Sequence, residues 1–330
     1  MIRIAILSYW HVHAKDYARQ AAQHPDAAIT ALWDEDPVRG RAQAEALGVP
    51  YYGNLEELLA KPDIDAVIVT APTTMHREVL TAAAEAGKHI FTEKVLAPTV
   101  RECREILKAV RRKGVRLMVS LPRLHAPFAL AAKEAIGQGK LGELTLVRAR
   151  LSHRGALSGE LPDYFFLPEQ TAGGAMIDLG CHPMVVTRLL LGMPESVSAS
   201  YGYITGRDVE DNAAAVLRYP GGALGIVEAG FASRSPFLLE AHGTEGSLTF
   251  SAHSRKMIVA GTASGAGTLE EWPLPDAPPS PMDQWLSEIR SGTSDDRNAG
   301  FALDLTQLME AANLSARADR AVRLSEIGEA

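Results

Sequence analysis

The sequence predicts a two-domain α/β protein, in which a doubly wound parallel sheet is followed by a domain built on a large, mostly antiparallel open sheet. Three observations support this. The chain has 330 residues, which is long for one compact core. Over the first 120 residues, short apolar runs alternate with helical stretches. Further along, strand-like runs follow one another with turns between them. We expect the domains to cover residues 1–121 and 122–330, with the option that the last helix packs back on the first domain.

The expected strands of the first domain are short apolar runs, at residues 2–7, 28–33, 65–70, 88–92 and 115–119. Helices are expected between them, at residues 14–23, 37–48, 74–87 and 99–114. Pro37 favours a helix start, and glycines end the last three of these helices. This alternation predicts parallel strands joined by right-handed crossovers.

In the second domain, helices are expected at 126–137, 176–191 and 298–317. Pro183 must kink the middle helix or mark its true first turn. Strand patterns occupy 144–151, 196–203, 213–219, 223–229, 237–241 and 247–250. Residues 262–281 are rich in Gly, Ser and Pro, so they are expected to form a loop.

Composition and charge limit the classes of partner and the compartment that are expected. A formal net charge of -7 without a basic face argues against nucleic-acid binding. The two cysteines are far apart in sequence, so a reducing compartment is favoured over a disulfide scaffold. We find no leader pattern at the start and no run of 18 apolar residues. A cytoplasmic protein without a membrane partner is therefore expected.

Ligands of a doubly wound sheet bind at the carboxyl ends of its strands. Here those positions hold Ser8, Asp34, Ala71-Pro72 and Glu93-Lys94. A lysine at such a strand end is partly desolvated, which lowers its pKa and suits it to hold or deprotonate a substrate hydroxyl. The alternative is a surface lysine that pairs with Glu93.

Asp178 and His182 are four residues apart and share one face of a helix. A carboxylate one turn from a histidine can fix its tautomer and stabilise its charged form, so that His182 can take a proton from an alcohol. The alternative is an acidic residue favourably placed near a helix start. Neighbouring Cys181 is interpreted as a small packed residue rather than a nucleophile.

The loop after the first strand has lost the glycines of a dinucleotide-binding loop. They are expected at positions 8, 10 and 13, which hold Ser8, Trp10 and His13. Asp34 remains where a ribose hydroxyl would be bound, and the acidic run 34–36 would repel a 2′-phosphate, which favours NAD over NADP. Alternatively, His11 and His13 could ligate a metal, as in a metal-dependent hydrolase. No further histidine cluster follows, so no metal is predicted.

Several motifs together resemble the Gfo/Idh/MocA oxidoreductase family. Residues 71–76 resemble its Thr-Pro-Asn-x-x-His element, and Glu93-Lys94-Val95 resembles Glu-Lys-Pro. Residues 140–143 are similar to the element that opens its second sheet, and residues 243–247 to a turn between late strands. The most specific match is residues 173–182, similar to Gly-Gly-x-x-x-Asp-x-Gly-x-His. The resemblance covers nearly the whole chain.

The resemblance implies an N-terminal Rossmann-type domain that binds NAD(P), and hydride transfer between nicotinamide and a sugar, inositol or related polyol. It implies catalytic roles for Lys94, Asp178 and His182, and a homodimer or homotetramer formed through the second sheet. Substrate contacts are expected from Arg123 and, on the loop 152–170, from His153 and Tyr164. The predicted cofactor-binding residues are Ser8, Trp10, His11, Val12, Asp34, Ala71, Pro72, His76 and Glu93.

Three positions depart from the family pattern: the glycine-free loop, Val95 in place of proline, and Val185 where many members have a second aspartate. Since a non-proline cis bond costs about 3 kcal/mol, no cis bond is expected before Val95. The missing glycines leave two alternatives open. One is a sugar-binding or regulatory protein that has lost redox function, and the other is the metal-dependent hydrolase.

Overall fold

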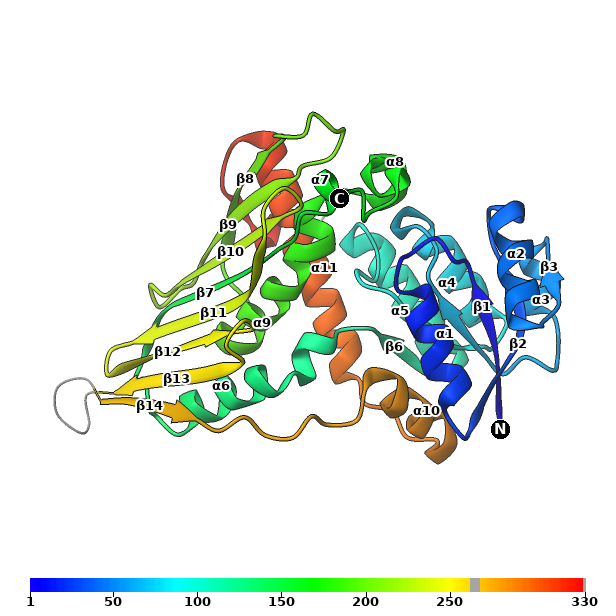
Figure 1. The fold of residues 1–330 in the computed structure, drawn as a ribbon, viewed down its shortest axis with the longest axis horizontal. Helices are drawn as coiled ribbons and strands as arrows, with labels where there is room; N and C mark the ends of the chain where they lie inside the picture. Colours follow the sequence, from blue (N-terminus) through cyan, green and yellow to red (C-terminus); the bar gives the residue numbers. More distant parts are fainter. Residues whose placement is uncertain (262–267, 329–330) are drawn as a thin grey trace. The chain divides into compact units, whose positions relative to one another are not determined.

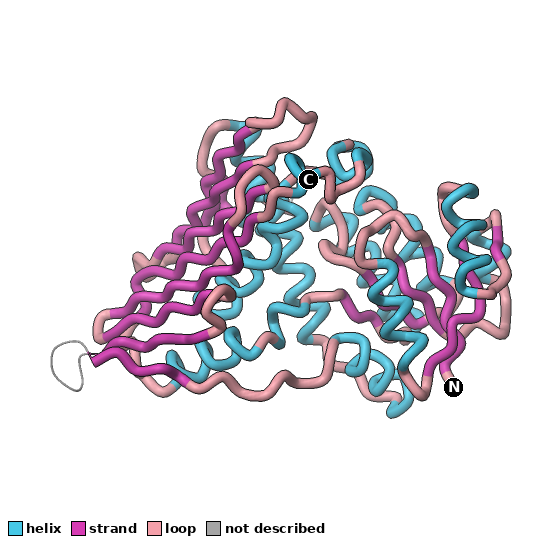
Figure 2. Tube along the Cα trace, viewed as in Figure 1, coloured by secondary structure: helices cyan, strands magenta, loops and turns pink. Residues whose placement is uncertain are grey.

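The computed structural model describes residues 1–261 and 268–328. The chain forms two compact units, one of Met1–Ser120 with Pro279–Leu303 and one of Leu121–Pro278 with Asp304–Ala330. The first contains a six-stranded sheet and the second a nine-stranded sheet, both seen as magenta strands in Figure 2. The predicted fold class is therefore confirmed: a parallel sheet is followed by a mostly antiparallel one.

The strands of the first sheet are all parallel and follow the order β3-β2-β1-β4-β5-β6. Their bounds are β1 Ile2–Leu7, β2 Ala27–Trp33, β3 Tyr51–Tyr52, β4 Ala66–Val69, β5 His89–Thr92 and β6 Leu117–Val119. The direction of winding reverses between β1 and β4. In open α/β sheets, ligands bind at this switch point, outside the carboxyl ends of the strands.

The helices of the first unit are α1 Ala14–Gln23, α2 Pro37–Leu47, α3 Leu55–Leu59, η1 Thr73–Met75, α4 His76–Glu85, α5 Val100–Lys113 and α10 Pro281–Ser291. One core cluster joins α1, α2 and α10 to the sheet, with Ile4, Tyr17 and Trp285 among its buried members. Two glycines end helices as expected: Gly48 after α2 and Gly114 after α5, with φ of 67° and 65°.

The nine-stranded sheet has the order β14-β13-β12-β11-β7-β10-β9-β8-β15. Its strands are β7 Leu144–Ser152, β8 Ser196–Gly202, β9 Asn212–Arg218, β10 Leu224–Gly230, β11 Ser235–Gly243, β12 Gly246–Ser251, β13 Lys256–Gly261, β14 Thr268–Trp272 and β15 Val322–Arg323. Among the described strands of this second sheet, β7 and β10 form a parallel pair and all other neighbours are antiparallel. Burial alternates along β9, where Ala213, Ala215 and Leu217 are buried, so one face of the sheet is packed and the other is open.

The helices of the second unit are η2 Pro122–His125, α6 Pro127–Gly137, α7 Gly155–Ser158, η3 Asp163–Phe166, α8 Pro168–Thr171, η4 Met176–Gly180, α9 Cys181–Leu191 and η5 Leu324–Glu326. The long helix α11, Arg297–Ala318, begins in the first unit and continues into the second. Helices α6, α9 and α11 lie on one side of the nine-stranded sheet (Figure 1). Helix α9 contacts β7 and β10, the parallel pair at its centre.

One local prediction is confirmed in one of its two forms, and two others need correction. The segment before Pro183 is a π-helical turn, Met176–Gly180, and Pro183 is the third residue of α9, so the proline marks the first turn of the α-helical part. The expected loop 262–281 contains β14; its residues 262–267 lie outside the described residues. Helix α10 begins at Pro281, where no helix was expected, and is capped by Ser280 and Asp283.

One described segment, Pro168–Leu191, is long and apolar enough to cross a membrane. It spans 24 residues, and 67% of its most apolar window is buried inside the fold. Core helices of water-soluble proteins have the same composition, so this segment is accounted for by packing.

Candidate active site

The predicted strand-end residues lie at one edge of the parallel sheet. Ser8 follows β1, Asp34 follows β2, Ala71 comes two residues after β4, and Lys94 comes two residues after β5. All strands of this sheet run in the same direction, so their carboxyl ends share one edge. Lys94 is buried, with 5% of its surface exposed, which agrees with the expected desolvated position rather than a surface one.

In the glycine-free loop, the backbone N–H groups of three residues are hydrogen-bonded within the protein. Ser8 has a φ of 76°, the left-handed conformation that glycine would adopt there. The Tyr9 N–H donates to Asp34 (2.8 Å) and the Trp10 N–H to Ser8 Oγ (3.0 Å). The His11 N–H donates to the Thr70 carbonyl (3.1 Å). In a glycine-rich loop, such groups point at the diphosphate of the dinucleotide.

The side chains of this loop differ in exposure. Trp10 and His11 are buried, with 3% and 6% of their surface exposed, while Val12 is 42% exposed. The His13 N–H donates to His11 Nδ1 at 3.2 Å. The loop therefore holds its turn without glycine, through contacts made by side chains.

The carboxylate of Asp34 is fully engaged. Arg39 pairs with it through two nitrogens, Nε at 3.0 Å and Nη2 at 2.6 Å. Its oxygens also accept the N–H groups of Tyr9 and Asp36, both at 2.8 Å. Arg39 also contacts the neighbouring Glu35 at 2.6 Å. The acid predicted to bind ribose thus stands in a bidentate ion pair, which fixes its orientation at the sheet edge.

Glu93 is the centre of a buried hydrogen-bond network. Tyr17 Oη lies 3.0 Å from both of its carboxylate oxygens and 2.8 Å from Ser120 Oγ. His13 Nδ1 lies 3.0 Å from Glu93 Oε1. Burial by itself would raise the pKa of Glu93, but His11, the hydrogen bond from His13, and Lys94 together hold that pKa well below its usual range. Glu93 is therefore an anion that ties the first loop to the ends of β5 and β6.

His11, His13 and Glu93 also place one potential ligand atom each within 4.8 Å of one another. Their hydrogen bonds argue against a metal between them. His11 Nδ1 accepts the His13 N–H, so a neutral His11 carries its proton on Nε2. His13 Nδ1 faces the anionic Glu93 and donates its proton there. With these tautomers the two nitrogens of His11 serve as a hydrogen-bond acceptor and an N–H, whereas His13 Nε2 carries a lone pair, so the two histidines supply one imidazole ligand rather than two.

His76 and Val95 form a buried link behind the strand ends. His76 Nδ1 lies 3.0 Å from the Val95 carbonyl and Nε2 lies 3.2 Å from the Ala71 carbonyl. Burial lowers the pKa of His76, which is only 1% exposed. The expectation of no cis bond was wrong: the Lys94–Val95 peptide is cis, and His76 contacts the carbonyl of the peptide that follows it, Val95–Leu96. The predicted contact between His76 and cofactor stays a prediction.

In the second unit, the helical segment of the family motif presents two side chains. From Gly174 to Thr187, every residue is buried except Asp178 and His182. Asp178 lies in the π-helical turn and His182 in the first turn of α9. Cys181 is buried, and its thiol donates to the Asp178 carbonyl at 3.0 Å, so it is a packed residue of this turn. The segment therefore exposes a carboxylate and an imidazole and little else.

Arg123 lies in η2, which packs against α9. Its guanidinium stands over two aromatic rings, 5.0 Å from the centroid of Phe237 and 6.0 Å from that of Phe128. Burial lowers the pKa of Arg123, partly opposed by Cys181. Proximity to Cys181 places Arg123 beside the turn that carries Asp178 and His182.

The predicted substrate loop packs against the same turn. His153 stacks on Phe231, with centroids 5.3 Å apart and ring planes at 17°. Phe231 belongs to an apolar cluster with Phe166, Ala175 and Leu179. Tyr164, half-buried in η3, stands next to the buried Phe165. His153 is thus joined through Phe231 to the cluster around the π-helical turn.

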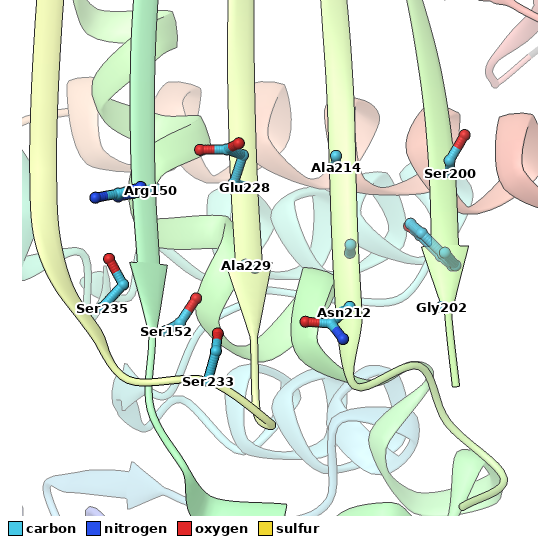
Figure 3. Close-up of a pocket in the computed structure, with 12 residues that line it drawn as sticks. Arg150, Ser152, Ser200, Gly202, Asn212, Ala214, Glu228, Ala229, Ser233 and Ser235 are labelled. Atoms are coloured by element: carbon cyan, nitrogen blue, oxygen red, sulfur yellow. The ribbon is translucent and has the colours of Figure 1, made fainter. Parts of the chain in front are cut away.

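A hollow of about 490 Å³ lies elsewhere, on the open face of the nine-stranded sheet. Figure 3 shows its polar rim, which includes Arg150, Ser152, Asn212 and Glu228, with the helices passing behind the strands. None of the predicted site residues lines it. Its position on the uncovered face separates it from the turn of Asp178 and His182.

Sequence reasoning missed four supporting residues. Arg39 neutralises Asp34, Tyr17 bonds to Glu93, Ser120 bonds to that tyrosine, and Glu210 bonds to the start of the motif helix. Tyr17 stands four residues after His13, a spacing that places both on one helix face, so a local signal existed. For Arg39, Ser120 and Glu210, no local sequence signal indicated the partner.

Comparison with known protein families gives two matches. The family model described as "Oxidoreductase family, NAD-binding Rossmann fold" covers residues 2–121. The model described as "GFO/IDH/MocA C-terminal domain" covers residues 129–249. Among solved structures, a levoglucosan dehydrogenase in complex with NADH and levoglucosan has the same fold, with a TM-score of 0.83, 23% identity, and coverage of 98% of this chain and 99% of that one.

Two characterised relatives are similar in sequence. The D-xylose 1-dehydrogenase (NADP(+)) 2 of Haloferax volcanii is 32% identical, over 70% of this chain and 69% of that protein. The 1,5-anhydro-D-fructose reductase of Ensifer adhaerens is 30% identical, over 71% and 72%. The two family models together match residues 2–121 and 129–249, which is well over half of the chain. The protein is a member of the GFO/IDH/MocA family of oxidoreductases.

Proposed function

We propose that the protein is an NAD(P)-dependent oxidoreductase that transfers hydride between nicotinamide and a CH–OH carbon of a sugar, inositol or related polyol. One observation carries the proposal: a motif segment of fourteen residues, 174–187, is buried except for Asp178 and His182. A carboxylate and an imidazole one turn apart can hold and transfer a proton. The relatives support the substrate class, because their names specify xylose and anhydrofructose as substrates.

The roles of the residues follow from their chemistry. A bound nicotinamide supplies the hydride acceptor or donor. In the oxidising direction His182 takes the hydroxyl proton from the carbon that loses hydride, and in the reducing direction it returns that proton. Asp178 stabilises the imidazolium that forms. Lys94, buried at its strand end, donates hydrogen bonds to the substrate oxygen and stabilises negative charge on it.

The sheet edge fits a dinucleotide in most of its parts. The strand order, the left-handed turn at Ser8 and the acid at Asp34 are those of a dinucleotide-binding sheet. Asp34 would bind the adenosine ribose by exchanging one of its four protein donors for a ribose hydroxyl. The backbone at Ala71-Pro72 would line the cofactor, and Lys94 would face its nicotinamide end. The first loop fits less well, because its N–H groups at residues 9 to 11 are already bonded.

NAD is proposed over NADP. Asp34 and Glu35 place two carboxylates beside the single guanidinium of Arg39. A 2′-phosphate would approach these acids and displace Arg39 from them, at an electrostatic cost.

Calorimetric titration with NAD, NADP and their reduced forms tests the proposal, together with a turnover screen over aldoses, anhydrosugars and inositols. We expect micromolar to millimolar cofactor affinity with NAD preferred, and turnover of at least one polyol. Absence of binding for all four dinucleotides at millimolar concentration would reject it.

Two observations support other candidates. The occupied N–H groups of the first loop favour a sugar-binding protein without redox function, which would bind polyols in the same titrations and show no cofactor binding. The other candidate is a metal-dependent hydrolase: His11, His13 and Glu93 place ligand atoms within 4.8 Å of one another, although the hydrogen bond that His11 Nδ1 accepts opposes a metal there. Elemental analysis of protein purified without chelators separates this candidate, which requires about one zinc, manganese or iron ion per chain.

The assembly and location are also proposed: a cytoplasmic homodimer or homotetramer formed through the open face of the nine-stranded sheet. That face carries the ion pairs of Arg148 with Glu228 and Glu240, at 3.0 and 3.7 Å, and the exposed Val216 and Leu224. Mixed apolar and paired-charge surfaces of this kind suit a two-fold interface.

A further inference from the structure

A single residue closes the start of the segment that carries Asp178 and His182. Glu210 Oε2 accepts the N–H of Gly174 and Oε1 accepts that of Met176, both at 2.9 Å. The Glu210 carbonyl accepts the intervening N–H of Ala175, also at 2.9 Å. The first N–H groups of a helix have no partner within the helix, so three successive ones are satisfied here by one residue.

The approach of Glu210 depends on glycine. A Cβ at Gly174 would lie 2.1 Å from the Glu210 carbonyl oxygen and 2.9 Å from its Oε2. Such distances are far below van der Waals contact. The Gly-Gly of the motif therefore serves, at its second position, to admit the backbone and carboxylate of Glu210.

Glu210 is itself held rigidly. It is 3% exposed, and burial raises its pKa, partly opposed by the N–H groups it accepts. Its neighbour Asp211 accepts the N–H groups of Ile204 and Thr205, at 3.0 and 2.5 Å. The backbone of Asp211 bonds to Gly202 and Phe231. The pair thus stands between β8, β9 and the end of β10, on the sheet rather than on a loose loop.

The capped turn leads directly to Asp178. The Asp178 N–H donates to the Gly174 carbonyl at 3.1 Å, and the π-helical turn Met176–Gly180 continues into α9. A π-helical turn is wider than an α-helical one and is stable only where its surroundings hold it. Relaxation of this turn to α-helical spacing would rotate Asp178 relative to His182.

We infer that Glu210 is a positioning residue for the proton-transfer pair, acting through the N-terminal turn. This rests on the proposed role of Asp178 and His182. The carboxylate fixes two backbone N–H groups and the Glu210 carbonyl fixes the one between them, and through these three bonds the wide turn in which Asp178 stands is held to the sheet.

The test compares Glu210→Gln and Glu210→Ala with Ser315→Ala. Ser315 is a matched control, because it is buried in the same unit and its Oγ also accepts a backbone N–H, that of Ala199 at 2.9 Å. Each variant is measured by thermal unfolding and by an NMR pH titration of the His182 ring, assigned with His182→Gln. Steady-state kinetics on a polyol substrate complete the set, at a temperature where circular dichroism shows every variant folded.

All three variants are expected to unfold at lower temperature than the wild type. Only the Glu210 variants are expected to shift the titration midpoint of His182 and to lower kcat, by about tenfold or more in Glu210→Ala, while KM changes less than kcat. Glu210→Gln keeps one acceptor oxygen, so it should lie between Glu210→Ala and the wild type.

A result in which the Glu210 variants lose stability like Ser315→Ala, but keep the wild-type His182 titration and kcat, would overturn the inference. If Glu210→Ala does not fold, Glu210→Gln decides the question by the same criteria. Wild-type protein without turnover would count against the proposed function, and the His182 titration would still decide the role of Glu210.

Discussion

Glu93 and Lys94, two buried neighbours at the end of β5, have different roles. Glu93 is bonded to Tyr17 and His13, so its charge is used within the protein. Lys94 follows directly and is equally buried, at the ligand-binding edge of the sheet. The Glu93 carboxylate therefore stabilises the fold, and the Lys94 ammonium is the group proposed to contact the substrate.

Replacing Lys94 by methionine tests that division. Lys94→Met is expected to lower kcat/KM by a factor of about 10² to 10³, because a donor to the substrate oxygen is lost. Lys88→Met is the matched control: Lys88 is buried before the same strand and donates to the carbonyls of Lys61 and Ile64, at 2.8 and 2.9 Å. It should lower stability and leave kcat/KM near the wild-type value. Equal losses of kcat/KM in both variants would contradict the role of Lys94.

The charge of Glu93 gives a pH prediction. Its folded-state pKa is depressed below 4.5, so its contribution to stability is present above about pH 4.5 and is lost as the pH falls through the folded pKa. Glu93→Gln should therefore be less stable than the wild type by about 2 kcal/mol at pH 7, with the gap closing in acid. Urea unfolding at pH 7, 5.5 and 4 measures this. A gap that stays constant over this range would show that Glu93 carries no depressed pKa.

At the scale of elements, the first loop keeps the turn of a dinucleotide-binding loop while its chemistry changes. Ser8 retains the left-handed conformation, and its hydroxyl accepts an N–H that a ligand would otherwise receive. The loop thus has the left-handed turn, but the Trp10 N–H is already bonded within the protein. We expect this to weaken the binding of a dinucleotide.

Ser8→Gly tests the element directly. The variant removes a left-handed non-glycine residue, worth about 1 kcal/mol, and loses a hydrogen bond of about the same value, so stability should barely change. It frees the Trp10 N–H, so dinucleotide affinity should rise severalfold. Scanning calorimetry measures the stability of the variant, and cofactor titration measures its dinucleotide affinity. Weaker dinucleotide binding in the variant would show that the loop does not face the cofactor.

The elements also show how far local pattern reaches. Helix α1 has the predicted bounds, and Thr99 and Gly114 cap α5 where the sequence places its ends. Those signals depend on a few adjacent residues. Helix α10 and β14 were missed because Gly, Ser and Pro around them dominate the local composition. Strand β14 is the hairpin partner of β13, whereas the burial of α10 comes from partners distant in sequence. Trp285 of α10 packs on Phe91, for example, with ring centroids 5.7 Å apart.

For the whole molecule, each unit contributes a separate part of the proposed chemistry. The first contains the parallel sheet edge with Lys94, and the second contains the turn with Asp178 and His182. The open face of the nine-stranded sheet is the surface proposed for assembly. Its apolar members stand beside paired charges on β7, β10 and β11.

A double variant, Val216→Glu with Ile226→Glu, should convert the proposed oligomer to monomers, since four unpaired carboxylates would meet in a two-fold interface. Val38→Glu is the control, because Val38 is 78% exposed on α2 of the first unit. Light scattering after size exclusion gives the mass of each. An unchanged mass in the double variant would place any interface elsewhere.

The sequence by itself determined the two sheets, the residues at the strand ends and the spacing of Asp178 and His182, because strand and helix periods and capping residues are local properties. Only the tertiary structure decided which partners those residues have. Tyr17 and Glu93 are 76 residues apart and Gly174 and Glu210 are 36 apart, yet each pair is in hydrogen-bond contact. Periodicity fixes the face on which a side chain lies, but the crossovers and sheet pairings choose what stands opposite it.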